Sequence, residues 1–156
     1  RFASDFDGRK RNMIVQVISA LIGSIGFAVF FNMKRKQIIL AGAGGAATWI
    51  VYLLCQQQIE GYFVPYFIAS IFVAVYGEIM ARMNRAPATI FLTAAAVPLI
   101  PGGSLYYTMA GLVNGDQALF AESGASAVTI ALAISLGFVV VAIITKYITG
   151  ITSRRK

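Results

Sequence analysis

The sequence contains no histidine and a single cysteine, Cys55. The absence of histidine excludes Ser/His and Cys/His catalytic pairs and metal sites built on imidazole, and a lone cysteine excludes an internal disulfide. No nucleophile–base pair can be assembled from the remaining residues. We therefore expect a protein that is not an enzyme and that needs no cofactor or metal ion.

Charged residues are also scarce. They make up 12% of the 156 residues, whereas hydrophobic residues make up 58% and the mean hydropathy is +0.77. A soluble domain carries about 25% charged residues. The composition therefore predicts an all-α, multi-pass membrane protein with the lipid bilayer as its first partner.

Five apolar segments follow a polar stretch at residues 1–12. They predict about five transmembrane helices in a single domain over residues 13–152, with a basic cytoplasmic tail at 153–156. For residues 1–12 two interpretations stay open: a genuine polar leader, or a remnant of upstream sequence with Met13 as the natural start, which we favour. The segments are Met13–Phe31, Ile38–Leu54, Tyr62–Ala81, Ala88–Val113 and Ala125–Ile148.

Glycines in the first two segments predict close helix contacts, because small residues let membrane helices approach. Gly23 and Gly26 provide such a face in the first segment, and Gly42, Gly44 and Gly45 provide one in the second.

Basic residues alternate along the chain. The turns at 34–36 and 82–85 hold five Lys or Arg, whereas 55–61 and 114–124, which we expect to be polar loops, hold none. The positive-inside rule then places the basic turns and the C-terminus in the cytoplasm and the N-terminus outside, although the three basic residues at 9–11 oppose this. Orientation signals explain the net charge of +7, so we expect no nucleic-acid binding.

The fourth segment is interrupted by two prolines and two adjacent glycines. Pro98 and Pro101 each remove a backbone donor, and Gly102 and Gly103 add backbone freedom, so the sequence predicts a helix that is broken at Pro98–Gly103. The ten apolar residues on each side span about 15 Å as helix, half of a hydrocarbon core of about 30 Å. We expect the break near the membrane midplane, where several transporter folds bind substrate.

No charge lies near this break, so a substrate carboxylate would have to be met by backbone N–H groups and helix dipoles. Ser104 equally suits the N-cap of the second half-helix, and Thr89 and Thr93 are expected to bond their own backbone. The predicted substrate-binding residues are Pro98, Pro101, Gly102, Gly103, Ser104, Tyr106 and Tyr107, with the two tyrosines shaping the cavity.

Glu78 and Arg82 stand four residues apart, which on a helix favours an ion pair. One interpretation is a structural salt bridge at the membrane boundary. The other is a gating or proton-carrying role, because Glu78 is the only carboxylate inside any expected span.

These two motifs resemble the threonine/serine exporter family, and most closely its small, separately encoded membrane subunit, whose two-subunit version is associated with succinate export. The resemblance covers most of Met13–Thr152 and implies a ten-helix transporter of two unequal five-helix halves. This chain would be the second half, and a second membrane subunit of the same family would supply the first. The residues that carry the resemblance are Glu78, Ala81, Arg82, Pro87, Phe91, the run Pro98-Leu99-Ile100-Pro101-Gly102-Gly103, Leu105 and Tyr106.

We therefore expect a subunit of a secondary exporter that moves a small carboxylate-bearing metabolite out across the cytoplasmic membrane. Threonine, serine and a C4 dicarboxylate such as succinate are the candidates. Two other interpretations stay open: a non-transporting scaffold subunit that assembles a partner transporter, and a homo-oligomeric channel. A higher oligomer is compatible with each of them.

Overall fold

The computed structural model describes the backbone of residues 2–153 and the side chains of residues 13–148. Arg154–Lys156, most of the expected basic tail, lie outside the described residues. Every element in the described part is helical. In chain order the elements are α1 (Phe2–Phe30), α2 (Arg35–Gln58), α3 (Phe63–Asn84), α4 (Ala88–Ala96), the 3₁₀ turn η1 (Val97–Leu99), α5 (Gly102–Asn114) and α6 (Gln117–Ser153).

Four helices are long and apolar enough to cross a membrane: α2, α3, Met13–Phe30 of α1, and Gln117–Ile148 of α6. A bent pair, Ala88–Leu99 and Gly102–Asn114, counts as a fifth span if its two parts are taken together, and its axes differ by 55°. The protein is thus an all-α, multi-pass membrane protein with a broken fourth segment, as the sequence predicted.

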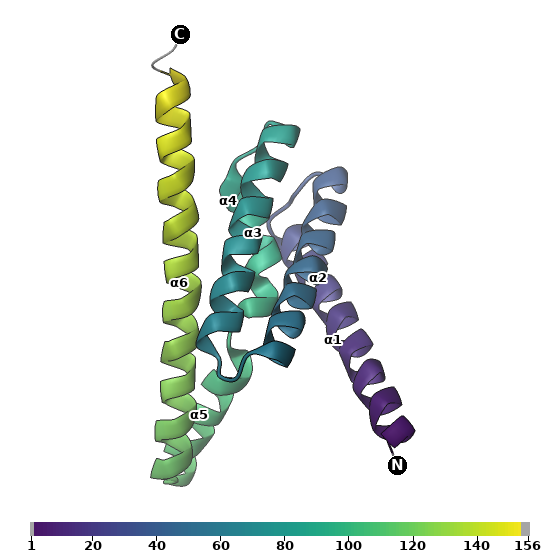
Figure 1. Ribbon diagram of the computed structural model, residues 1–156, viewed down its shortest axis with the longest axis vertical. Coiled ribbons are helices and arrows are strands. Elements are labelled where there is room, and N and C mark those ends of the chain that lie inside the picture. The colour runs from purple at the N-terminus through teal and green to yellow at the C-terminus, as the bar shows by residue number, and fades with distance from the viewer. Residues whose placement is uncertain (1, 154–156) are drawn as a thin grey trace.

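Helices α2, α3 and α4 form the centre of the molecule, with α1 against α2 and α6 against α3. Figure 1 shows the turns α1–α2 and α3–α4 together at one end of the bundle, and the turn α2–α3 at the other. The N-terminal end of α1 lies at the same end of the bundle as the turn α2–α3. Residues 2–12, the polar stretch, continue the backbone of α1 as helix.

The glycines of α2 are points of close packing, as predicted, and Gly42 and Gly45 face α1. A Cβ atom built at Gly45 would lie 1.8 Å from the hydroxyl of Ser24, and one at Gly42 would lie 2.6 Å from Ile25. Gly23 and Gly26 of α1 do not make such a contact within this chain, because nothing lies within 4 Å of an atom added there. The face that α1 packs on α2 carries Ala20, Ser24 and Ala28 instead, because residues four apart share one face of a helix.

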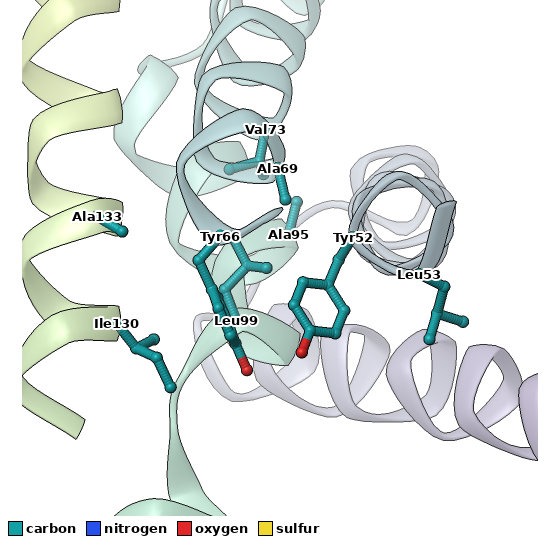
Figure 2. Close-up of a cluster of buried hydrophobic side chains, with 9 residues drawn as sticks. All are labelled: Tyr52, Leu53, Tyr66, Ala69, Val73, Ala95, Leu99, Ile130 and Ala133. Atoms are coloured by element: carbon teal, nitrogen blue, oxygen red, sulfur yellow. The ribbon is translucent and has the colours of Figure 1, made fainter. Parts of the chain in front are cut away.

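The largest buried cluster joins α2, α3, α4, η1 and α6 (Figure 2). Leu99, the last residue of η1, is fully buried there and belongs to the same cluster as Tyr66 in the first turn of α3. The break after Leu99 therefore lies toward the N-terminal end of α3. The helix is discontinuous there, as predicted: α5 does not continue along the central bundle but turns away and packs on α6. That the break lies near the membrane midplane stays a prediction.

Helices α5 and α6 form a tight hairpin, which corrects the expected polar loop at Asn114–Gly124. Only Gly115 and Asp116 separate the two helices, and α6 begins at Gln117 rather than at Ala125. Gly115 takes the left-handed conformation (φ 72°) that ends α5, and a carboxylate oxygen of Asp116 accepts the N–H of Leu119 at 3.0 Å. Capping thus turns residues that look like a loop into the first turns of α6.

Candidate functional site

A cavity of about 310 Å³ opens on the surface beside the helix break. Its walls come from three elements that are far apart in sequence: α1, α2 and η1. The lining residues are Val15, Gln16, Ser19, Ala20, Trp49 and Pro98. Of the predicted substrate-binding residues, Pro98 alone is among them.

The polar groups of this cavity are ordered by one contact between α1 and α2. The indole Nε1 of Trp49 donates a hydrogen bond to Oε1 of Gln16 at 3.3 Å. The Trp49 ring lies 4.7 Å from the ring of Tyr52, which in turn lies 4.5 Å from that of Tyr66. Figure 2 shows the Tyr52 and Tyr66 hydroxyl groups at neighbouring ends of the two rings. A row of aromatic side chains thus runs from the cavity into the core.

Two of the polar residues that line the cavity, Gln16 and Ser19, are exposed on a strongly apolar helix. Thr129 and Ser135 of α6 return their hydroxyl groups to the helix backbone, whereas Ser19 donates no hydrogen bond to any described residue. An amide and a free hydroxyl that face hydrocarbon are costly, and such groups in membrane helices usually face protein or a water-filled cavity. This surface is therefore suited to a second protein or to a polar ligand, and poorly suited to lipid.

The backbone at the break offers two free donors. The N–H of Gly102 donates to the carbonyl of Ile100 at 2.7 Å, and that of Leu105 donates to Pro101 at 3.0 Å. Between them, the N–H groups of Gly103 and Ser104 have no acceptor among the residues that the structure describes. They lie in the first turn of α5, where the helix dipole favours an anion.

Ser104 does not cap α5, contrary to one prediction. The N-cap position is occupied by Pro101, so Ser104 is already the third residue of the helix. Thr108 donates its hydroxyl proton to the carbonyl of Ser104 at 2.7 Å. The Thr93 hydroxyl bonds the carbonyl of Thr89, as predicted.

Tyr106 and Tyr107 do not join the cavity beside Pro98. Their side chains are 69% and 55% exposed on α5, whose main neighbour is α6. Within this chain, the predicted site is divided into a cavity at Pro98, a pair of free amides, and two tyrosines that face outward.

Glu78 and Arg82 form the predicted ion pair, with 3.9 Å between Arg82 Nε and a Glu78 carboxylate oxygen. The pair lies in the last two turns of α3, whereas the break lies beside the first turn. Its side chains are 34% and 62% exposed. Glu78 is not the only carboxylate in an apolar helix, because Glu122 lies within the apolar part of α6.

Sequence reasoning missed Gln16 and Ser19 and gave Trp49 no role in a site. Gln16 and Trp49 are 33 residues apart, and only the packing of α1 on α2 brings them together. A polar amide inside an apolar run was the available signal. Within the described residues, no three His, Cys, Asp or Glu side chains gather as metal ligands.

The family model described as threonine/serine exporter, ThrE, matches residues 16–144, which is most of the chain and includes the break and all of the cavity lining except Val15. The chain belongs to the threonine/serine exporter family. Membership in this exporter family gives the protein a transport role and agrees with its apolar helices. No solved structure matches the chain.

Proposed function

We propose that this chain is one subunit of a secondary exporter in the bacterial cytoplasmic membrane, completed by a second membrane subunit of the same family. The observation that supports a partner is the surface at Gln16 and Ser19. A largely apolar cavity that carries the polar groups of Gln16 and Ser19 and opens sideways from an apolar helix suits half of a binding site, and a second protein is the covering that costs least there.

We further propose an amino acid with a hydroxyl side chain, serine or threonine, as the substrate. The indole of Trp49 in the cavity suits an ammonium group by a cation–π contact. The free amides of Gly103 and Ser104, which lie at the helix break outside the cavity lining, suit a carboxylate. Gln16 and Ser19 suit the substrate hydroxyl. No Lys or Arg lines the cavity, so succinate, with two carboxylates and no cation, has less support.

In this proposal the turns at 34–36 and 82–85 face the cytoplasm, and the N-terminus faces outward. Figure 1 places both turns at one end of the bundle, as this orientation requires. Glu78 with Arg82 would then lie at the cytoplasmic end of the path, as a gate or proton acceptor.

The test is efflux of labelled serine from cells that express this chain with its partner subunit. Gln16→Ala should lower efflux about tenfold, the effect of losing about 1.4 kcal/mol of binding. Gln57→Ala is the matched control, because Gln57 is also an exposed glutamine, lies outside the cavity and makes a weak hydrogen bond to the sulfur of Met13. The same variant should also lower the preference for serine over alanine, since a site built for a hydroxyl discriminates against its absence.

The rival functions give different results. If the Gln16→Ala complex assembles and exports serine at the wild-type rate, the chain is a scaffold and the proposed site is wrong. If this chain alone conducts serine without a proton gradient, it is a channel, and the two-subunit exporter is wrong.

A further inference from the structure

Five basic side chains gather at one end of the helical bundle, and we call this surface the basic face. Two turns bring them together, α1–α2 and α3–α4. Met33, in the first turn, is only 7% exposed because it packs in a buried cluster with Ala81 at the end of α3, and Ala86 of the second turn packs on the same cluster. The basic face consists of Lys34, Arg35, Lys36, Arg82 and Arg85, all exposed.

Little negative charge opposes the basic face. Glu78, paired with Arg82, is the one described acid from the helices that meet there. The other described acids belong to the opposite end or to the hairpin: Glu60 to the turn α2–α3, and Asp116 and Glu122 to the α5–α6 hairpin. The N-terminal ends of α2 and α4 also point to this end and add the positive ends of their dipoles.

Both turns are held in fixed conformations. Arg85 takes the left-handed region with φ 50°, and the N–H of Ala86 donates to Ala81 at 3.1 Å. Asn32, in the turn α1–α2, takes the same left-handed conformation with φ 53°, and the N–H of Met33 donates to the carbonyl of Ala28 at 3.1 Å. These bonds are those of a Schellman cap, so the backbone that carries the charges is ordered rather than loose.

Apolar side chains lie one turn away from the basic face. Ile39 in the first turns of α2, and Ile79 and Met83 in the last turns of α3, are 71%, 50% and 73% exposed. Exposed apolar side chains within one turn of a cationic face match an amphipathic anion, with a charged head and hydrocarbon tails. An acidic peptide would be matched by the charges but not by the apolar side chains.

We propose that the basic face binds the phosphodiester headgroup of an anionic phospholipid, whose acyl chains cover Ile39, Ile79 and Met83. Basic pockets between membrane helices bind such headgroups through charge-assisted hydrogen bonds from Lys and Arg. The site is independent of the proposed substrate cavity, which lies toward the other end of α3.

Native mass spectrometry of the full chain, released from micelles that contain equal amounts of phosphatidylglycerol and phosphatidylethanolamine, tests this site. The wild-type chain should retain phosphatidylglycerol about fivefold more than phosphatidylethanolamine. Arg85→Gln should remove most of this preference, and Arg85→Lys should keep it. Lys146→Gln, which also removes one exposed positive charge but on α6, should leave the preference unchanged.

Three results would overturn the proposal. Equal retention of the two lipids would show that the basic face only sets orientation. A loss of preference as large in Lys146→Gln as in Arg85→Gln would show a nonspecific charge effect. Displacement of the lipid by millimolar inorganic phosphate, or by an acidic peptide, would assign the site to a soluble anion or to a protein partner.

Discussion

At the scale of single residues, contact between α2, α3 and α4 depends on the absence of a side chain at Gly44. A Cβ atom there would lie 2.3 Å from the ring of Tyr76 and 3.1 Å from Ala95. Tyr76 is held in place because its hydroxyl donates to the carbonyl of Leu40 at 2.6 Å. One glycine thus allows one tyrosine to join two helices.

Gly44→Ala should destabilise the protein by about 1–3 kcal/mol, the usual cost of overpacking a tight contact. Gly23→Ala is the control, because Gly23 also lies within a helix but has nothing within 4 Å of the added atom. Both variants gain the same helix propensity, so their difference reports packing. The measurement is thermal unfolding in detergent followed by Trp49 fluorescence, and equal melting temperatures would contradict the contact.

At the scale of elements, the hairpin of α5 and α6 is the feature that sequence reasoning described least well. Its closest approach is at Gly111, where a Cβ atom would lie 2.6 Å from the backbone nitrogen of Phe120 and 3.0 Å from the carbonyl oxygen of Asp116. Backbone atoms cannot rotate away as side chains can. The hairpin is therefore closed at its turn by glycine.

Gly111→Ala should open the hairpin, whereas Gly124→Ala should not. Gly124 belongs to the same interface, but its added atom would lie 3.5 Å from Thr108, an ordinary contact. Hydrogen exchange of the amides in α5, measured by mass spectrometry, should speed up about tenfold or more in Gly111→Ala only. Unchanged exchange in both variants would mean that α5 does not pack on α6 in this way.

The helices, the basic turns and the break could be predicted, because hydropathy, charge and proline act locally. The start of α6 could not, since Asp116 and Glu122 suggested a polar loop at 114–124. The carboxylate of Asp116 instead accepts the N–H of Leu119 in the first turn of α6, and Gly115 ends α5. Local capping outweighed the average polarity of these residues.

Pro98 is the one predicted substrate-binding residue that lines the cavity. The rest of the cavity could not be predicted because it depends on contacts between distant parts of the chain. Proline marks a break in the sequence whatever surrounds it, but the cavity beside it depends on how α1 crosses α2. Gln16 and Trp49 become neighbours only through that crossing. Tyr106 and Tyr107 were predicted to shape the cavity because they follow the break in sequence, but their side chains are exposed on α5, which packs on α6.

At the scale of the whole molecule, α6 is longer than a membrane is thick. Its 37 residues span about 55 Å, against a hydrocarbon core of about 30 Å. The middle of α6 packs on α3 and its N-terminal part on α5 (Figure 1). A helix of this length has to tilt or extend beyond the bilayer, so one end of the hairpin is expected to reach the outer surface.

Cysteine labelling tests the proposed orientation of the whole chain. In a Cys55→Ser background, Lys36→Cys should react with a membrane-impermeant maleimide only after the cells are opened. Glu60→Cys and Asp116→Cys should react in intact cells, because both lie in turns between helices that end away from the basic turns. The reverse pattern would invert the orientation and assign the basic turns to the outside.

The most direct test of the central claim, that the helix break carries part of the substrate site, is serine efflux by the assembled complex with Gly103→Leu. A side chain at this position has nothing within 4 Å at its first atom, so it crowds the free amides of Gly103 and Ser104 without disturbing the packing of this chain. Gly26→Leu, equally open and on α1, is the control. We predict at least about a tenfold loss of efflux for Gly103→Leu, corresponding to about 1.4 kcal/mol, and none for Gly26→Leu. Wild-type efflux by an assembled Gly103→Leu complex would contradict the claim.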